Sequence, residues 1–125
     1  MQADKMKVNK IKVSTLTGPL LNYWVAKADE KEVLIAGGTA QILHHVEQGA
    51  ECYQVYSPST DWSQGGPIIE REKMQLDPFV KSGATVRMIR PDYQLQHIEQ
   101  RGETYLEAAM RCYVASKFGE EVDEI

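Results

Sequence analysis

Two segments of the chain carry hydrophobic residues at the spacing of an amphipathic helix. Residues 18–28 follow a threonine and have a proline in their first turn, which is typical of a helix start. Residues 103–118 are followed by a glycine, which is typical of a helix end. Both segments are therefore predicted to form helices. Their hydrophobic positions are Leu20, Leu21, Trp24, Val25 and Ala28 in the first, and Leu106, Ala109, Met110, Tyr113 and Val114 in the second.

The segments between the two helices favour β-strands. Residues 32–36 and 39–45 are apolar runs on either side of two glycines and predict a hairpin, although residues 39–47 also fit a helix. Residues 57–67 are rich in Ser, Pro and Gly, form the longest turn-rich stretch of the chain, and are not expected to be regular throughout. Further strands are predicted near residues 11–13, 52–56, 74–76, 85–89 and 93–98, with a turn at Arg101-Gly102.

This order of elements predicts an α+β fold in which two helices pack on one face of a mostly antiparallel sheet. The opposite face of such a sheet would need a cover. Symmetric dimers are the commonest way for a small protein to bury a second face, so we expect a homo-oligomer.

Composition limits the chain to one small domain. It has 125 residues, of which 42% are hydrophobic and 26% are charged, as in ordinary globular proteins. We expect a single domain over residues 1–125, with residues 1–10 as a flexible leader and 119–125 as an acidic tail. No apolar run approaches the roughly 18 residues of a membrane span, and the N-terminus lacks the apolar core of a signal peptide. A cytosolic protein without membrane partners is expected.

The charge makes nucleic acid an improbable main partner. The formal net charge is −4, and phosphate binding requires a dense basic surface that the chain lacks. Lysines and acids instead gather at opposite ends of the sequence. The two groups are Lys5, Lys7, Lys10 and Lys12 near the start, and Glu120, Glu121, Asp123 and Glu124 near the end.

No motif for a cofactor, a metal or a catalytic nucleophile is present in the sequence. Gly65-Gly66 lacks the Gly-Lys-Ser/Thr continuation of a phosphate-binding loop. His44 and His45 are adjacent in the sequence, so their side chains point in different directions and do not converge on a metal ion. Cys52 and Cys112 are expected to be free thiols, with Cys112 in the core of the last helix. A binding protein without cofactors is therefore favoured over an enzyme.

Residues 56–71 are the strongest candidate for a binding site. They concentrate hydroxyl groups, an amide, an indole and a guanidinium. Trp62 can stack on a flat ring, and Arg71 can bind a phosphate or a carboxylate through two hydrogen bonds. In the structural alternative, Asp61 caps its own turn and Trp62 fills the core beneath the loop.

The same segment resembles the hallmark of a known family. Residues 56–72 look like the central motif of the NinX family of small bacteriophage proteins. Residues 106–119 resemble the terminal helix of that family, and residues 11–18 and 23–28 are similar to its start. The resemblance extends over residues 11–122. The resemblance implies a phage protein that acts in the cytoplasm of the host bacterium. It does not indicate which activity the protein has.

In such a setting, the first hypothesis is a protein that binds a nucleotide-like small molecule and sequesters a signal of host immunity. Tyr56 and Trp62 would stack on the base, Arg71 would bind phosphate, and hydroxyl groups with Asp61 would bind the ribose. The candidate ligand-binding residues are Tyr56, Ser57, Ser59, Thr60, Asp61, Trp62, Gln64, Gly65, Gly66 and Arg71, with Arg111 and Trp24 further out.

The alternative hypothesis is a protein-binding inhibitor or adaptor of a host enzyme. A small acidic domain can cover a basic surface of its partner. The two hypotheses differ in geometry, since a ligand-binding loop should line a concavity and a docking surface should not.

Overall fold

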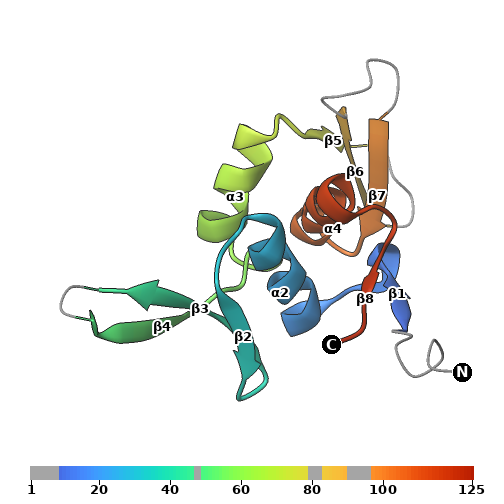
Figure 1. Cartoon of the computed structure of the whole chain (residues 1–125). Helices are drawn as coiled ribbons and strands as arrows, with labels where there is room; N and C mark the ends of the chain where they lie inside the picture. Colours follow the sequence, from blue (N-terminus) through green and yellow to red (C-terminus); the bar gives the residue numbers. More distant parts are fainter. Residues whose placement is uncertain (1–8, 47–48, 79–82, 90–96) are drawn as a thin grey trace, which may run out of the picture.

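The computed structural model describes residues 9–46, 49–78, 83–89 and 97–125. This part of the chain forms an α+β fold in which helices pack against small antiparallel sheets (Figure 1). The strands are β1 (Lys10–Lys12), β2 (Val33–Ala36), β3 (Thr39–His45), β4 (Glu51–Val55), β5 (Gln75–Asp77), β6 (Ala84–Ile89), β7 (His97–Gly102) and β8 (Glu121–Asp123). The helices are the short 3-10 turn η1 (Val13–Thr15) and the α-helices α2 (Gly18–Ala28), α3 (Trp62–Arg71) and α4 (Tyr105–Phe118).

Helix α4 forms the centre of the molecule. The sheet β5–β6–β7 covers one side of it, α2 packs on another, and α3 lies nearby (Figure 1). Thr104 caps its first turn by accepting a hydrogen bond from the Glu107 backbone N–H, and Gly119 ends it with a φ of 88°. The five predicted hydrophobic positions of this helix are all buried, which confirms the prediction.

Helix α2 has the bounds that the sequence pattern predicts. Its buried side includes Leu21, Trp24 and Val25, which face α4 and the strands β2 and β3. The Trp24 ring meets Tyr23 and Phe118 edge to face, with ring centroids 5.4 and 5.3 Å apart. Trp24, an outer candidate for ligand binding, therefore serves as an anchor of the core.

Strands β2, β3 and β4 form a three-stranded sheet, called the arm here, that projects from the helices (Figure 1). The hairpin between β2 and β3 is confirmed, because Gly37 and Gly38 take positive φ angles of 60° and 77°. These angles suit a two-residue turn of type I′. The alternative helix at residues 39–47 is wrong, since residues 39–45 pair with both neighbouring strands.

The two ends of the described chain pair with each other. Strand β1 lies antiparallel to β8, and Lys10 Nζ forms a 2.5 Å ion pair with Asp123 Oδ1. Lys12 stands opposite Glu121 in the same ladder. The lysines and acids that lie far apart in the sequence thus neutralise each other in part, and residues 121–123 of the expected tail form a strand.

Three details differ from the sequence prediction. The described residues contain three α-helices instead of two, since residues 62–71, which overlap the turn-rich segment 57–67, form α3. Their strands form three separate sheets, all antiparallel, instead of one. Arg101-Gly102 ends β7 and is not a turn. Most of the strand expected at 93–98 lies outside the described residues, and β7 begins at His97.

Candidate functional site

Several residues of the candidate segment build the junction between β4 and α3. Asp61 caps α3, because its Oδ1 accepts hydrogen bonds from the Ser63 backbone N–H at 2.9 Å and from Ser63 Oγ at 2.7 Å. The Ser57 carbonyl accepts from the N–H groups of Thr60 and Asp61, and the Ser57 N–H donates to Gln64 Oε1 at 2.6 Å. These polar groups are therefore already engaged within the segment.

Two further residues of the segment are buried. The Ser59 backbone N–H donates to Oδ1 of Asn22 in α2 at 3.0 Å, and Ser59 Oγ is enclosed without a hydrogen-bond partner among the described residues. Tyr56 is also buried, and burial together with the nearby Asp29 carboxylate raises its pKa to about 12. Tyr56 thus stays protonated, and its ring is not available for stacking on a ligand at the surface.

Trp62 and Arg71 lie far apart although both belong to α3. Nine residues along a helix correspond to a rotation of about 180° and a rise of about 13 Å, so the two side chains point from opposite faces and opposite ends. Trp62 is 55% exposed, which contradicts its expected alternative as a plug of the core. The structure does not bring these two side chains together around one small ligand.

Arg71 instead joins a polar cluster between the helices. Its Nη2 lies 3.0 Å from Asp29 Oδ1 and 2.9 Å from the Tyr113 hydroxyl, while its Nε donates to Glu72 at 2.9 Å. The Tyr113 hydroxyl donates to Asp29 at 2.9 Å, and the guanidinium lies over the Tyr113 ring. The hydrogen bond to Glu72 is the main reason that the pKa of Arg71 is raised.

Sequence reasoning missed Asp29 and Tyr113 as members of this cluster. Tyr113 fits the hydrophobic stripe of α4, and Asp29 directly follows α2, so both have an ordinary local role. Nothing in the sequence indicates that they meet at Arg71. Because the cluster connects α2, α3 and α4 and each partner is engaged, it holds these helices together.

Arg111 lies apart from the segment, in the lining of a cleft. Its Nε donates to the Leu16 carbonyl at 2.9 Å and its Nη1 to the Arg101 carbonyl at 2.5 Å, so a buried guanidinium connects α4 with β7 and with the residue that follows η1. The cleft measures about 1260 Å³, and no residue of 56–71 lines it. Cations such as Lys12 and carboxylates such as Glu99 mix along its walls, so no single charge of ligand is selected.

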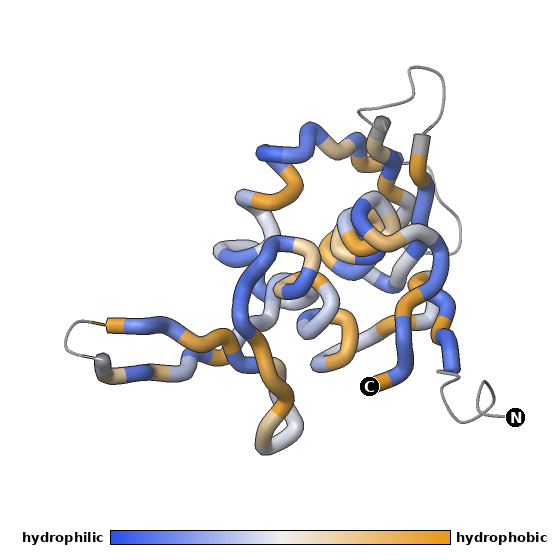
Figure 2. Tube along the Cα trace, viewed as in Figure 1, coloured by the Kyte–Doolittle hydropathy of each residue, from blue (hydrophilic) through white to orange (hydrophobic). Residues whose placement is uncertain are grey.

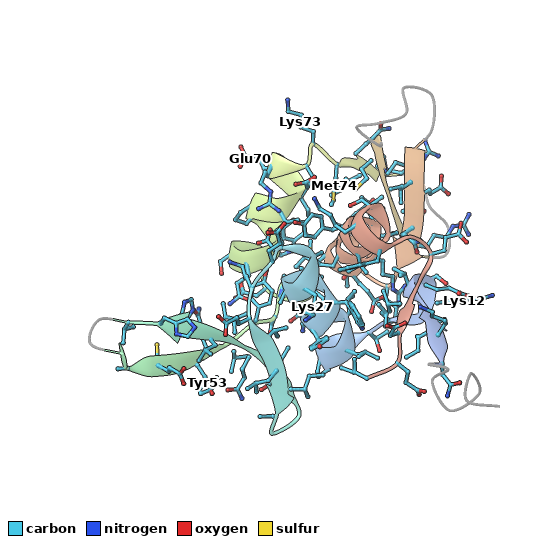
Figure 3. The ribbon with its side chains drawn as sticks, viewed as in Figure 1. Lys12, Lys27, Tyr53, Glu70, Lys73 and Met74 are labelled. Atoms are coloured by element: carbon cyan, nitrogen blue, oxygen red, sulfur yellow. The ribbon has the colours of Figure 1, made fainter. Side chains whose placement is uncertain are left out.

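The face of the arm that is turned away from the helices exposes apolar side chains. Residues that stand directly opposite each other share a face of a sheet, which places Leu34 beside Gln41 and Val55, and Leu43 beside Tyr53. Leu34, Tyr53 and Val55 are 36%, 51% and 49% exposed. We call Leu34, Leu43, Tyr53 and Val55 the outer face. Figure 2 shows hydrophobic stretches on the strands of the arm, and Figure 3 labels Tyr53 on the side away from α3.

A small ionic group borders this outer face. His45 Nε2 lies 2.9 Å from Glu32 Oε1, and His45 Nδ1 lies 3.9 Å from Glu51 Oε2. The hydrogen bond to Glu32 is the main cause that raises the pKa of His45 above its ordinary value of 6.5. Sequence reasoning missed the outer face, although Tyr53 and Val55 on either side of Gln54 were a usable signal.

The described residues hold no group of three His, Cys, Asp or Glu side chains arranged for a metal ion. No described helix is long and apolar enough to cross a membrane.

Comparison with known families identifies the chain. The family model described as "Bacteriophage P22, NinX" matches residues 12–117. The match covers most of the sequence, so the chain belongs to the NinX family of bacteriophage proteins. No curated protein sequence matches the chain.

Proposed function

From its membership in a phage family, we propose that the protein acts in the host cytoplasm as a protein-binding inhibitor or adaptor. The outer face of the arm is its docking surface. One observation carries this proposal: the arm exposes apolar and aromatic side chains on a face that no described element covers. Monomeric proteins rarely leave such groups together on the surface unless they bind something there.

The charge of this region indicates the kind of partner. No lysine or arginine occurs between Lys31 and Arg71, a stretch that includes the arm and most of α3. The same stretch contains five carboxylates, whereas the formal net charge of the whole protein is −4. The rest of the chain is therefore close to neutral, and the net negative charge belongs to this stretch, which includes the arm. An acidic, apolar surface fits a partner that is basic and apolar, such as a nucleic-acid-binding protein of the host.

Trp62 favours a second candidate function, the binding of a nucleotide-like small molecule. Its indole is the most exposed aromatic side chain among the described residues, and a flat exposed ring can stack on a base. The other residues expected to bind the ligand are mostly engaged in the fold, and the cleft lies elsewhere. The protein-binding function is therefore the better supported of the two.

Crosslinking in living cells tests the proposed function. A photo-crosslinking amino acid replaces Tyr53 on the outer face or, as the matched control, Lys12 on the opposite side of the molecule (Figure 3). We expect the Tyr53 position to yield a covalent adduct with a basic host protein, and the Lys12 position to yield none of it.

The partner identified in this way is then purified and titrated with the intact protein. Tyr53→Ser and Val55→Ser should each weaken binding at least about tenfold, because each removes a large apolar contact from an interface. Raising the salt concentration should weaken binding as well. Adducts that are the same from both positions, or binding that ignores both substitutions, would contradict the proposed docking surface.

A further inference from the structure

Strand β4 forms a free edge of the arm. The strand order is β2–β3–β4, so β4 pairs with β3 on one side and with no described strand on the other. All five of its residues are exposed. Strands β2 and β3 pack on α2, whereas β4 packs chiefly on β3. The edge is therefore open to another chain.

The hydrogen-bond pattern shows which backbone groups face this edge. The Tyr56 N–H donates to the Ala40 carbonyl and the Val46 N–H donates to the Ala50 carbonyl, both at 2.9 Å. Because hydrogen-bonded pairs alternate along an antiparallel ladder, the backbone groups of Ala50, Cys52, Gln54 and Tyr56 point toward β3. The N–H and C=O groups of Glu51, Tyr53 and Val55 accordingly point outward.

Nothing in β4 protects this edge from pairing. Natural proteins guard exposed edges with lysine, proline, bulges or covering elements. Strand β4 contains neither lysine nor proline, and its residues pair with β3 in continuous register without a bulge. Glu51 is the single charge in the strand, and the aromatic and β-branched residues Tyr53 and Val55 favour strand pairing.

We propose that β4 accepts an extended segment of the partner protein as a fourth strand of the arm. This inference rests on the proposed protein-binding function and specifies how the partner binds. Three outward N–H groups and three outward C=O groups supply the hydrogen bonds, as in other cases of strand addition to a sheet edge. The side chains of Tyr53 and Val55 stand on the outer face beside the added strand, and that of Glu51 stands at its border.

The neighbouring side chains define the chemistry of that segment. Residues of the added strand that stand opposite Tyr53 and Val55 should be apolar, and the one opposite Glu51 should be cationic. A second copy of this chain fits less well, because each arm carries carboxylates and no lysine or arginine, so two arms repel each other. The occupant is therefore an extended basic and apolar segment of another protein.

A short synthetic peptide serves as the probe. Every second residue of this peptide is valine or lysine, and threonine occupies the positions between them. Titration into the intact protein should show binding, and a matched peptide with glutamate for lysine should bind at least about tenfold more weakly. Hydrogen exchange measured by NMR should slow at the amides of Glu51, Tyr53 and Val55 when the peptide binds. The amides of Cys52 and Gln54, which already face β3, should change little.

Two substitutions at one position separate backbone pairing from side-chain contact. Val55→Pro removes an outward N–H and should weaken peptide binding at least about tenfold, whereas Val55→Thr keeps the N–H and shape and should change it less than about threefold. If Val55→Pro fails to fold, methylation of alternate peptide nitrogens removes the complementary hydrogen bonds, which the peptide N–H groups donate to the outward C=O groups of β4. It should abolish binding to the unchanged protein.

The possible failures are distinguishable. Peptide binding without protection of the three amides, or binding that tolerates nitrogen methylation, would overturn strand addition and leave the docking surface intact. Protection of these amides without any peptide, together with a dimer mass in light scattering, would assign the edge to a second copy and also overturn the inference. Absence of peptide binding would overturn it too, while the crosslinking experiment independently judges the proposed function.

Discussion

Gly65 and Gly66 are adjacent in α3, yet only one of them is required by packing. A Cβ at Gly65 would lie 2.3 Å from the Pro58 carbonyl oxygen and 2.6 Å from Leu106 Cδ2, which is closer than atoms can approach. A Cβ at Gly66 would lie 3.7 Å from Trp62 Cε3, an ordinary contact. Gly65 therefore allows α3 to approach the loop before it, whereas Gly66 only lowers helix propensity.

This difference predicts opposite effects of the same substitution. Gly65→Ala should lower the free energy of unfolding by about 2 kcal/mol, because the backbone at Pro58 must move. Gly66→Ala should raise it by about 0.5 to 1 kcal/mol, because alanine is the better helix former. Chemical denaturation of both variants measures the two effects. A Gly65→Ala variant as stable as the unchanged protein would refute the packing of α3 described here.

His45 gives a prediction that depends on pH. Glu32 raises the pKa of His45, so the pair stabilises the folded state when His45 is protonated and Glu32 is ionised. This contribution is fully present below the unfolded histidine pKa and is lost as the pH rises through the folded pKa. NMR titration should therefore give a lower pKa for His45 in Glu32→Gln than in the unchanged protein. An equal pKa in both proteins would remove Glu32 as the cause.

At the scale of the elements, α3 is held by its cap and by Arg71, and Trp62 is not needed for its position. Arg71→Ala should cost about 1 kcal/mol, since the guanidinium binds Asp29 and Tyr113 but is 48% exposed. Trp62→Ala should cost less than about 1 kcal/mol, since the indole is mostly in solvent. Thermal unfolding of the two variants tests this order.

The same two variants also test the small-molecule candidate. If a nucleotide-like ligand binds at Trp62, Trp62→Ala should weaken its titration at least about fivefold while the melting temperature changes little. Equal ligand affinity in the variant and the unchanged protein would leave the arm as the single proposed binding surface. A large loss of stability in Trp62→Ala would instead show that the indole is packed.

At the scale of the whole molecule, the two ends of the described chain close on each other through β1 and β8. Val122, in the middle of β8, is 3% exposed and packs in the core, whereas the ion pair of Lys10 and Asp123 lies in solvent. Val122→Ala should therefore cost roughly 1 to 3 kcal/mol, and Lys10→Ala less than about 1 kcal/mol. Denaturation curves measure the free energy of unfolding of both variants. Equal losses would show that the ion pair stabilises the fold as much as the burial of Val122 does.

The expected homo-oligomer is also a question of the whole molecule and stays a prediction. The sequence pattern suggested it because one face of a sheet would lack a cover, and the outer face of the arm is such a surface. The arm carries carboxylates and no lysine or arginine, which opposes the approach of a second arm. Light scattering at low and high salt measures whether copies associate, and a dimer that forms only at high salt would reveal this repulsion.

The sequence by itself determined the elements whose information is local. The spacing of apolar residues defined α2 and α4, because a helix that must bury a stripe repeats it every three or four residues. Gly37-Gly38 determined the first hairpin, because glycine takes positive φ without strain. The motif at 56–72 indicated the family, which the match over residues 12–117 confirms.

Only the tertiary structure decided the rest. Helix α3 contains two glycines and a proline that local propensity opposes, and it forms because Asp61 caps it and Gly65 packs against Pro58 and Leu106. Trp62 and Arg71 seemed one site in the sequence but lie on opposite faces of that helix. The outer face and the free edge of β4 exist because strand pairing and the position of α2 determine which apolar side chains are covered and which remain in solvent.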